Sequence, residues 1–186
     1  MFLQHKKTFL AKIDKSKIGK IDKRIKNLLD KINSNPHYYT TSSCSGRIVL
    51  ISKKSELKNE ASWLFVSHEK ADPKDIIKAL ENLPKEEIWF RFEPLILHVC
   101  ADTIGNAQLL VNMSRNLGLK RTGIQSTSKK ICIEICGTEF IDTLVAKEGK
   151  ILVSIDYLNI LVEEANKKME RNLSKIKNFE KEIEKL

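Results

Sequence analysis

In the stretch EIWFRFEPLILHVCA (residues 87–101), two sets of side chains alternate before a proline, and an apolar run that contains one histidine follows it. Successive side chains of a strand point to opposite faces. The first half therefore places Trp89, Arg91 and Glu93 on one face and three apolar side chains on the other, which we expect to be core. Pro94 cannot donate to a strand ladder, so the stretch is either two strands or one strand bent at this residue.

Strand and helix patterns continue on both sides of this stretch. Apolar alternation predicts strands, and spacing of three or four residues predicts helices. The predicted strands are RIVLIS (47–52), ASWLFVSH (61–68), KICIEIC (130–136) and FIDTLVAK (140–147), and the predicted helices are 4–13, 18–32, 73–83, 103–117 and 155–186. This irregular order indicates an α+β fold, with one mixed sheet, packed helices and a long C-terminal helix (155–186), in a single domain spanning 1–186. It argues against a doubly wound parallel sheet.

Positive charge is concentrated at the N-terminus. The 186-residue chain has a formal charge of +9, and residues 1–31 hold ten Lys or Arg against three Asp. A basic helical arm over residues 1–33 indicates a polyanionic partner, most simply nucleic acid. The alternative is that lysine only solvates helix faces, and charge alone does not decide between the two.

Several classes of protein are disfavoured. No apolar run reaches the roughly 20 residues of a membrane span, and the N-terminus lacks the features of a signal peptide. We expect a cytoplasmic protein. Cys132 and Cys136 lie on one predicted strand about 13 Å apart, too far to share a zinc ion, so no metal is expected. The phosphate-binding and nucleophile motifs GxGxxG, GxxxxGK[ST] and GxSxG are absent from the sequence.

The segment SSCSGR (42–47) is the most unusual in the chain. We expect a small-polar loop whose hydroxyls and amides surround an anion, with the guanidinium of Arg47 forking onto a carboxylate or phosphate. On the predicted strand 87–93, Arg91 and Glu93 either pair structurally or hold the two charged groups of a small zwitterion. His98 lies one strand away from them, which makes it a candidate for the same site.

These segments together resemble a known family. The resemblance rests on DKSKIGKID (14–22), YYTTSSCSGRI (38–48), WLFVSH (63–68), FRFEPLILHV (90–99), RNLG (115–118), TGIQS (122–126) and YLNILVEEANKKMERN (157–172). They are similar to the wybutosine-synthesis methyltransferases, which act on the hypermodified guanosine beside the anticodon of phenylalanine tRNA. The chain departs from the family at Lys17-Ile18-Gly19, where Lys-Gly is usual.

The resemblance implies S-adenosylmethionine as methyl donor, tRNA(Phe) as partner, methylation of N4 of a wyosine-type base, and a fold unlike that of Rossmann methyltransferases. It suggests His98 or Glu93 as proton acceptor, if a base is needed. The residues expected to bind the cofactor are Ser43, Ser45, Gly46, Arg47 and Arg91. Those expected to bind RNA are Lys17, Lys20, Lys23, Arg24, Arg115, Gln125 and Ser126. A non-catalytic RNA-binding module is the alternative reading.

Overall fold

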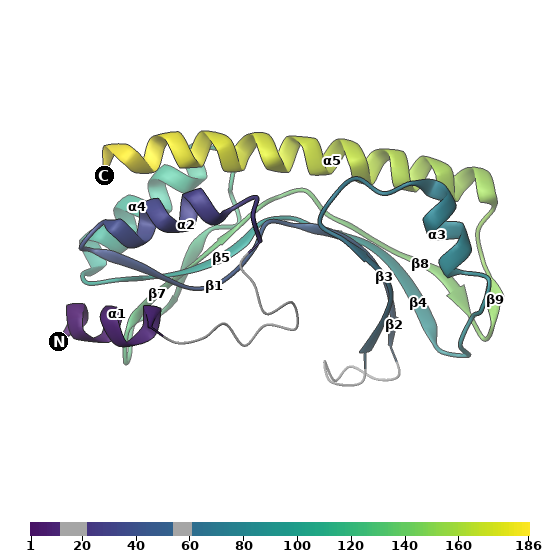
Figure 1. Ribbon diagram of the computed structural model, residues 1–186, viewed down its shortest axis with the longest axis horizontal. Coiled ribbons are helices and arrows are strands. Elements are labelled where there is room, and N and C mark those ends of the chain that lie inside the picture. Colours follow the sequence, from purple (N-terminus) through teal and green to yellow (C-terminus); the bar gives the residue numbers. More distant parts are fainter. Residues whose placement is uncertain (12–21, 54–60) are drawn as a thin grey trace. The chain divides into compact units, whose positions relative to one another are not determined.

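Two antiparallel sheets organise the computed structural model, which describes residues 1–11, 22–53 and 61–186 (Figure 1). Each sheet belongs to one of two compact units. Unit 1 comprises residues 1–45, 95–138 and 172–186, and unit 2 comprises 46–94 and 139–171. The α+β class and the long C-terminal helix are confirmed, whereas the expectation of one mixed sheet is wrong in that two sheets form, with antiparallel pairing throughout the described residues.

Unit 1 contains the first sheet, which we call sheet A, with the strand order β1-β5-β7-β6. Its strands are β1 (Tyr38–Cys44), β5 (Ile96–Ala101), β7 (Ile131–Cys136) and β6 (Gly123–Ser126). The helices α2 (Lys26–Ser34) and α4 (Ile104–Asn116) cover one face together with the C-terminal end of α5 (Ile155–Glu182) (Figure 1). The buried residues that meet there include Ile25, Leu28, Ile32, Leu97, Val99, Leu110, Ile133, Ile176 and Phe179. A short 3-10 helix, Ile183–Lys185, ends the chain on this core.

Unit 2 contains sheet B, with the strand order β3-β2-β4-β8-β9. Its strands are β3 (Ala61–Ser67), β2 (Arg47–Lys53), β4 (Glu87–Glu93), β8 (Ile141–Lys147) and β9 (Lys150–Ile151). The helix α3 (Pro73–Ala79) and the N-terminal part of α5 lie on the same side of this sheet (Figure 1). Asp72 caps α3 and Pro73 is its first residue, as the sequence predicts. Burial alternates strictly along β4, so the predicted core face of that strand is confirmed.

Three local predictions need correction. The polar segment before Arg47 is not a loop, because Tyr38–Cys44 is the edge strand β1. The segment 123–126, which lies outside the predicted strands, forms the strand β6. In the helix predicted over 18–32, residues 22–25 are not helical and α2 begins at Lys26, although Ile25, Leu28 and Ile32 are buried as expected. Residues 18–21 of that predicted helix lie outside the described residues.

Pro94 marks one point at which the chain passes from sheet B into unit 1. Glu93 ends β4 in sheet B, and Leu95 is already fully buried in the core of unit 1. A proline at this point has no amide hydrogen to continue a ladder, so the chain leaves one sheet there. The prediction of two separate strands in residues 87–101 is therefore confirmed, and the alternative of one bent strand is wrong.

Asn172 ties together the ends of two segments of unit 1. This residue of α5 is 1% exposed. Its Nδ2 donates to the carbonyl of Ser45 at 2.6 Å, and its Oδ1 accepts from the amide of Leu95 at 2.8 Å. Buried backbone groups left without partners cost roughly 1–3 kcal/mol each.

We therefore expect Asn172→Ala to lower the free energy of unfolding by roughly 2–4 kcal/mol, as measured by urea denaturation. Asn166 offers a matched control, because this residue of α5 bonds the amide and the carbonyl of Ala71 in the same way but is only partly buried. Asn166→Ala should cost less. Equal losses of unfolding free energy in the two variants would show that the deeper burial of Asn172 does not increase its contribution.

A second prediction concerns pH. Asp102 is partly desolvated, but hydrogen bonds from His37 and Asn106 hold the pKa of its carboxyl below its ordinary value. A lowered pKa stabilises the folded state above the unfolded-state pKa near 4, and this stability is lost as pH falls through the folded-state pKa. The difference in unfolding free energy between wild type and Asp102→Asn should thus be about 1 kcal/mol near neutral pH and shrink in acid. A difference that does not change with pH would contradict the assignment.

Candidate functional site

A row of hydrogen-bonded side chains crosses the face of sheet A opposite the core. Ser42 Oγ lies 2.8 Å from His98 Nδ1, and His98 Nε2 lies 3.1 Å from Glu134 Oε2. Gln125 Nε2 donates to the other oxygen of Glu134 at 3.2 Å. The four residues come from β1, β5, β7 and β6 in the order of the strands. We call Ser42, His98, Glu134 and Gln125 the sheet A relay.

Strand register explains this arrangement. His98 pairs with Ser42 on one side and with Glu134 on the other. Directly paired residues of antiparallel strands lie on the same face, so the three side chains meet. The side chains of His98 and Glu134 are 30% and 27% exposed, and Ser42 is exposed. The imidazole is therefore both held in place and accessible.

Only part of the relay follows from sequence. His98 and Gln125 are among the predicted site residues and Ser42 belongs to the predicted anion-binding segment SSCSGR, whereas Glu134 is not predicted. A signal for Glu134 exists, because it is the single charged residue in the apolar strand β7. No comparable signal distinguishes Ser42 from its serine neighbours.

The helix α1 (Phe2–Leu10) lies against the same face of sheet A, farther along β1. The rings of Phe2 and Phe9 lie 5.3 and 5.7 Å from that of Tyr39. Next to Tyr39 in the sheet are Cys100 and, beyond it, Cys132. Burial and the neighbouring Cys100 raise the pKa of the Cys132 thiol, which disfavours the reactive thiolate. This part of the face lies beside the relay and is mostly apolar, and its Cys132 is not a reactive thiolate.

A second polar arrangement lies on the face of sheet B that carries the partly exposed side chains of β4. Arg47 Nε donates to Glu93 Oε2 at 2.6 Å, and Arg91 Nε donates to Asp142 Oδ1 at 2.8 Å. Each guanidinium also lies against an indole ring. Arg47 is 4.6 Å from the ring centroid of Trp63, and Arg91 is 5.8 Å from that of Trp89.

Of the other predicted cofactor-binding residues, Ser45 is built into the fold. It is 1% exposed, its hydroxyl donates to Asp22, and its carbonyl accepts from Asn172. Gly46 has a φ of 108°, a backbone conformation that favours glycine. Ser43 is exposed on β1. Within SSCSGR, the exposed hydroxyls and Arg47 are therefore the groups that can reach a ligand.

The predicted RNA-binding residues that the structure describes all belong to unit 1. Lys23, Arg115 and Gln125 are exposed, and Arg24 and Ser126 are half-buried. Lys17 and Lys20 lie outside the described residues. Gln125 stands apart from the rest because it belongs to the relay.

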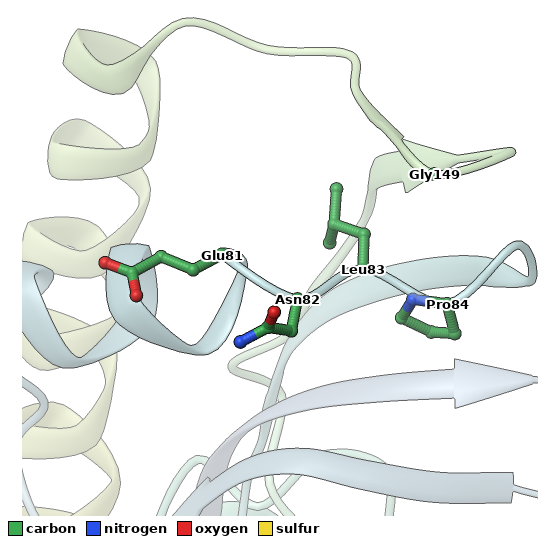
Figure 2. Close-up of a pocket in the computed structure, with 5 residues that line it drawn as sticks. All are labelled: Glu81, Asn82, Leu83, Pro84 and Gly149. Atoms are coloured by element: carbon green, nitrogen blue, oxygen red, sulfur yellow. The ribbon is translucent and has the colours of Figure 1, made fainter.

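A pocket of about 600 Å³ opens in unit 2 and is lined by Glu81, Asn82, Leu83, Pro84 and Gly149 (Figure 2). It lies between the loop after α3 and the turn that joins β8 to β9. Glu81 is the one ionisable residue among those five. The pocket includes none of the residues predicted for the site. In the described part of the chain, no cluster of side chains suits a metal ion and no helix could span a membrane.

Known proteins match this chain over nearly its whole length. The family model described as "Methyltransferase TYW3" matches residues 4–185. A zebrafish (Danio rerio) protein named "tRNA wybutosine-synthesizing protein 3 homolog" is 39% identical over 183 residues, covering 96% of this chain and 72% of its own. A Pyrococcus abyssi protein named "tRNA(Phe) 7-((3-amino-3-carboxypropyl)-4-demethylwyosine(37)-N(4))-methyltransferase 1" is 39% identical over 170 residues, covering 90% and 88%.

Solved structures show the same fold. The PH1069 protein of Pyrococcus horikoshii superposes with a TM-score of 0.85 at 37% identity, covering 98% of this chain and 92% of its own. A hypothetical protein from Aeropyrum pernix has a TM-score of 0.77 at 24% identity, covering 88% and 98%.

Proposed function

The chain belongs to the methyltransferase TYW3 family, and we propose that it transfers a methyl group from S-adenosylmethionine to N4 of a wyosine-type base in tRNA(Phe). The Pyrococcus relatives are named for this reaction on a base that carries a 3-amino-3-carboxypropyl group. The observation that carries the proposal is the sheet A relay, because methylation of a ring nitrogen that bears a hydrogen releases a proton.

His98 is suited to accept that proton. If Glu134 accepts a hydrogen bond from Nε2, then Nδ1 carries the lone pair and faces Ser42. As the N4–methyl bond forms, the N4 proton passes to Nδ1, directly or through the hydroxyl of Ser42. Glu134 then stabilises the resulting imidazolium, and Gln125 fixes the carboxylate.

Glu93, the other candidate base, is less suited to this role. Its Oε2 already accepts a hydrogen bond from Arg47 at 2.6 Å. We therefore assign the proton to His98.

When bound, S-adenosylmethionine would supply the methyl group from its sulfonium. The chain must clamp the charged methionyl end and exclude competing geometries. In unit 2, Arg47 and Arg91 offer partly exposed guanidinium groups, with side chains 26% and 19% exposed. In unit 1, Ser43 offers an exposed hydroxyl. Ser45 and Gly46, the other predicted cofactor-binding residues, would act through the backbone that precedes Arg47.

The tRNA partner is proposed from charge and from the relatives' names. Lys17, Lys20, Lys23 and Arg24 in the basic arm, with Arg115, would contact backbone phosphates. Gln125 and Ser126 would lie near the target base, which must leave the anticodon stack to react. We propose that the protein acts in the cytoplasm as one functional domain over residues 1–186.

We expect His98→Asn to lower the rate of methyl transfer about 100-fold or more, measured by single-turnover assay with mass spectrometry of the modified base. Affinity for S-adenosylhomocysteine and for tRNA should stay near wild type. His37→Asn is the matched control, because His37 also contacts a carboxylate, that of Asp102, on the same unit. It should leave the rate unchanged.

Wild-type rates in His98→Asn would show that the relay is not the proton acceptor. Binding of tRNA without any methylation by the wild-type protein would favour the non-catalytic RNA-binding module.

A further inference from the structure

The edge strand β6 carries a glycine on the face that bears the sheet A relay. β6 stands at one end of the strand order in sheet A. Gly123 pairs with Glu134 of the relay, and directly paired residues of antiparallel strands lie on the same face. The position beside Glu134, at the edge of the sheet, therefore has no side chain.

Neither backbone conformation nor packing explains this glycine. Among the described glycines, those with a positive φ are Gly46, Gly118 and Gly149, so Gly123 has an ordinary φ. In the described part of the chain, a Cβ added to Gly123 would meet no heavy atom within 4 Å. A glycine inside a strand weakens it and often marks a place where a ligand approaches the backbone closely. The open space beside the relay indicates such an approach.

A β-bulge next to Gly123 directs another side chain toward the relay. The register between β6 and β7 shifts between Ile124 and Ser126, so Gln125 is an extra residue in β6. Bulges are common at sheet edges and beside active sites, where they redirect a side chain. Here Gln125 Nε2 reaches Oε1 of Glu134 at 3.2 Å. Within four residues, β6 thus combines an open position and a redirected side chain, both beside the relay.

Positive charge lies at both ends of β6. Lys120 and Arg121 come shortly before the strand and Lys129 and Lys130 shortly after it, and all four are exposed. No aspartate or glutamate occurs in residues 103–133. Lysine and arginine are the main contacts of proteins to the phosphates of a nucleic-acid backbone. The charge around β6 therefore fits the backbone of the proposed tRNA substrate.

We propose that the target nucleotide of the tRNA lies against Gly123, with the RNA backbone running along β6 from one basic end to the other. Lys120 and Arg121 bind phosphate on one side of this nucleotide, and Lys129 and Lys130 bind phosphate on the other side. The outer edge of β6 offers backbone groups to which a base or ribose can hydrogen-bond. The inference rests on the proposed function and adds Gly123 to it as a positioning residue, which admits the nucleotide to the relay.

Gly123→Ala tests the close approach. The added methyl group would enter the open space, and alanine restricts the unfolded chain more than glycine does, so thermal unfolding should occur at the wild-type temperature or higher. Affinity for tRNA(Phe) carrying the demethylwyosine base, measured with S-adenosylhomocysteine present, should fall about tenfold or more. The single-turnover rate of methyl transfer should fall as well, whereas calorimetric affinity for S-adenosylhomocysteine alone should not change.

Gly105→Ala is the matched control. Gly105 lies in the first turn of α4, and it too lacks a positive φ. A Cβ there would make only an ordinary contact, at 3.9 Å from Oγ1 of Thr103. This variant should leave both tRNA affinity and methyl transfer unchanged.

The double variant Lys129→Ala/Lys130→Ala tests phosphate binding. Loss of two phosphate contacts should reduce the slope of log affinity against log salt concentration by about 1.4, at roughly 0.7 for each contact to a single strand. Lys74→Ala/Lys78→Ala is its matched control, because it removes two exposed lysines from α3 in unit 2. The slope for this control should keep its wild-type value.

Wild-type tRNA affinity in Gly123→Ala, or a wild-type salt slope in Lys129→Ala/Lys130→Ala, would overturn the inference. A loss of thermal stability in Gly123→Ala would show that the fold itself requires the glycine, and weaker binding of S-adenosylhomocysteine would place the cofactor in the open space. Either result would also overturn it.

The proposed function is tested separately, because methyl transfer by the wild-type protein can succeed when these variants bind tRNA normally. Binding of tRNA that depends on Gly123, without any methylation by the wild-type protein, would leave the inference standing and refute the proposed function.

Discussion

The carboxamide of Asn172 is the contact on which the geometry of unit 1 depends. It binds Ser45, just after β1, and Leu95, just before β5. These are the neighbouring strands that place Ser42 opposite His98. An apolar residue at position 172 would leave two buried backbone groups without partners. The buried carboxamide of Asn172 thus helps to align the two strands that carry Ser42 and His98 of the sheet A relay.

The two sheets carry different chemistry on their partly exposed faces. Sheet A presents a hydrogen-bonded imidazole suited to receiving a proton, and sheet B presents ion pairs beside indole rings suited to holding a charged, flat ligand. Neither resembles the glycine-rich turn with which dinucleotide-type folds bind their cofactors. The proposed cofactor affinity would therefore come from other groups, such as the guanidinium and aromatic groups on sheet B.

How much the sequence predicts depends on whether the interaction is local. The alternation in β4 predicts the faces of Trp89, Arg91 and Glu93 correctly, because a strand's own pattern determines them. The α+β class and the C-terminal helix follow from local periodicity in the same way. Partners of His98 could not be predicted, because they depend on which distant strands flank β5. The burial of Ser45 could not be predicted for the same reason, because its contacts come from remote segments of the chain.

The connection between β1 and β2 consists of Ser45 and Gly46 alone. The register of β2 is held by its neighbouring strands and its buried face, with Ile48 fully buried and Arg47 on the partly exposed face. One inserted residue would therefore have to be taken up by the link itself or by a bulge. A link of two residues, one of them buried and the other at a positive φ, has little room for this, so relatives should show substitutions here more often than insertions or deletions.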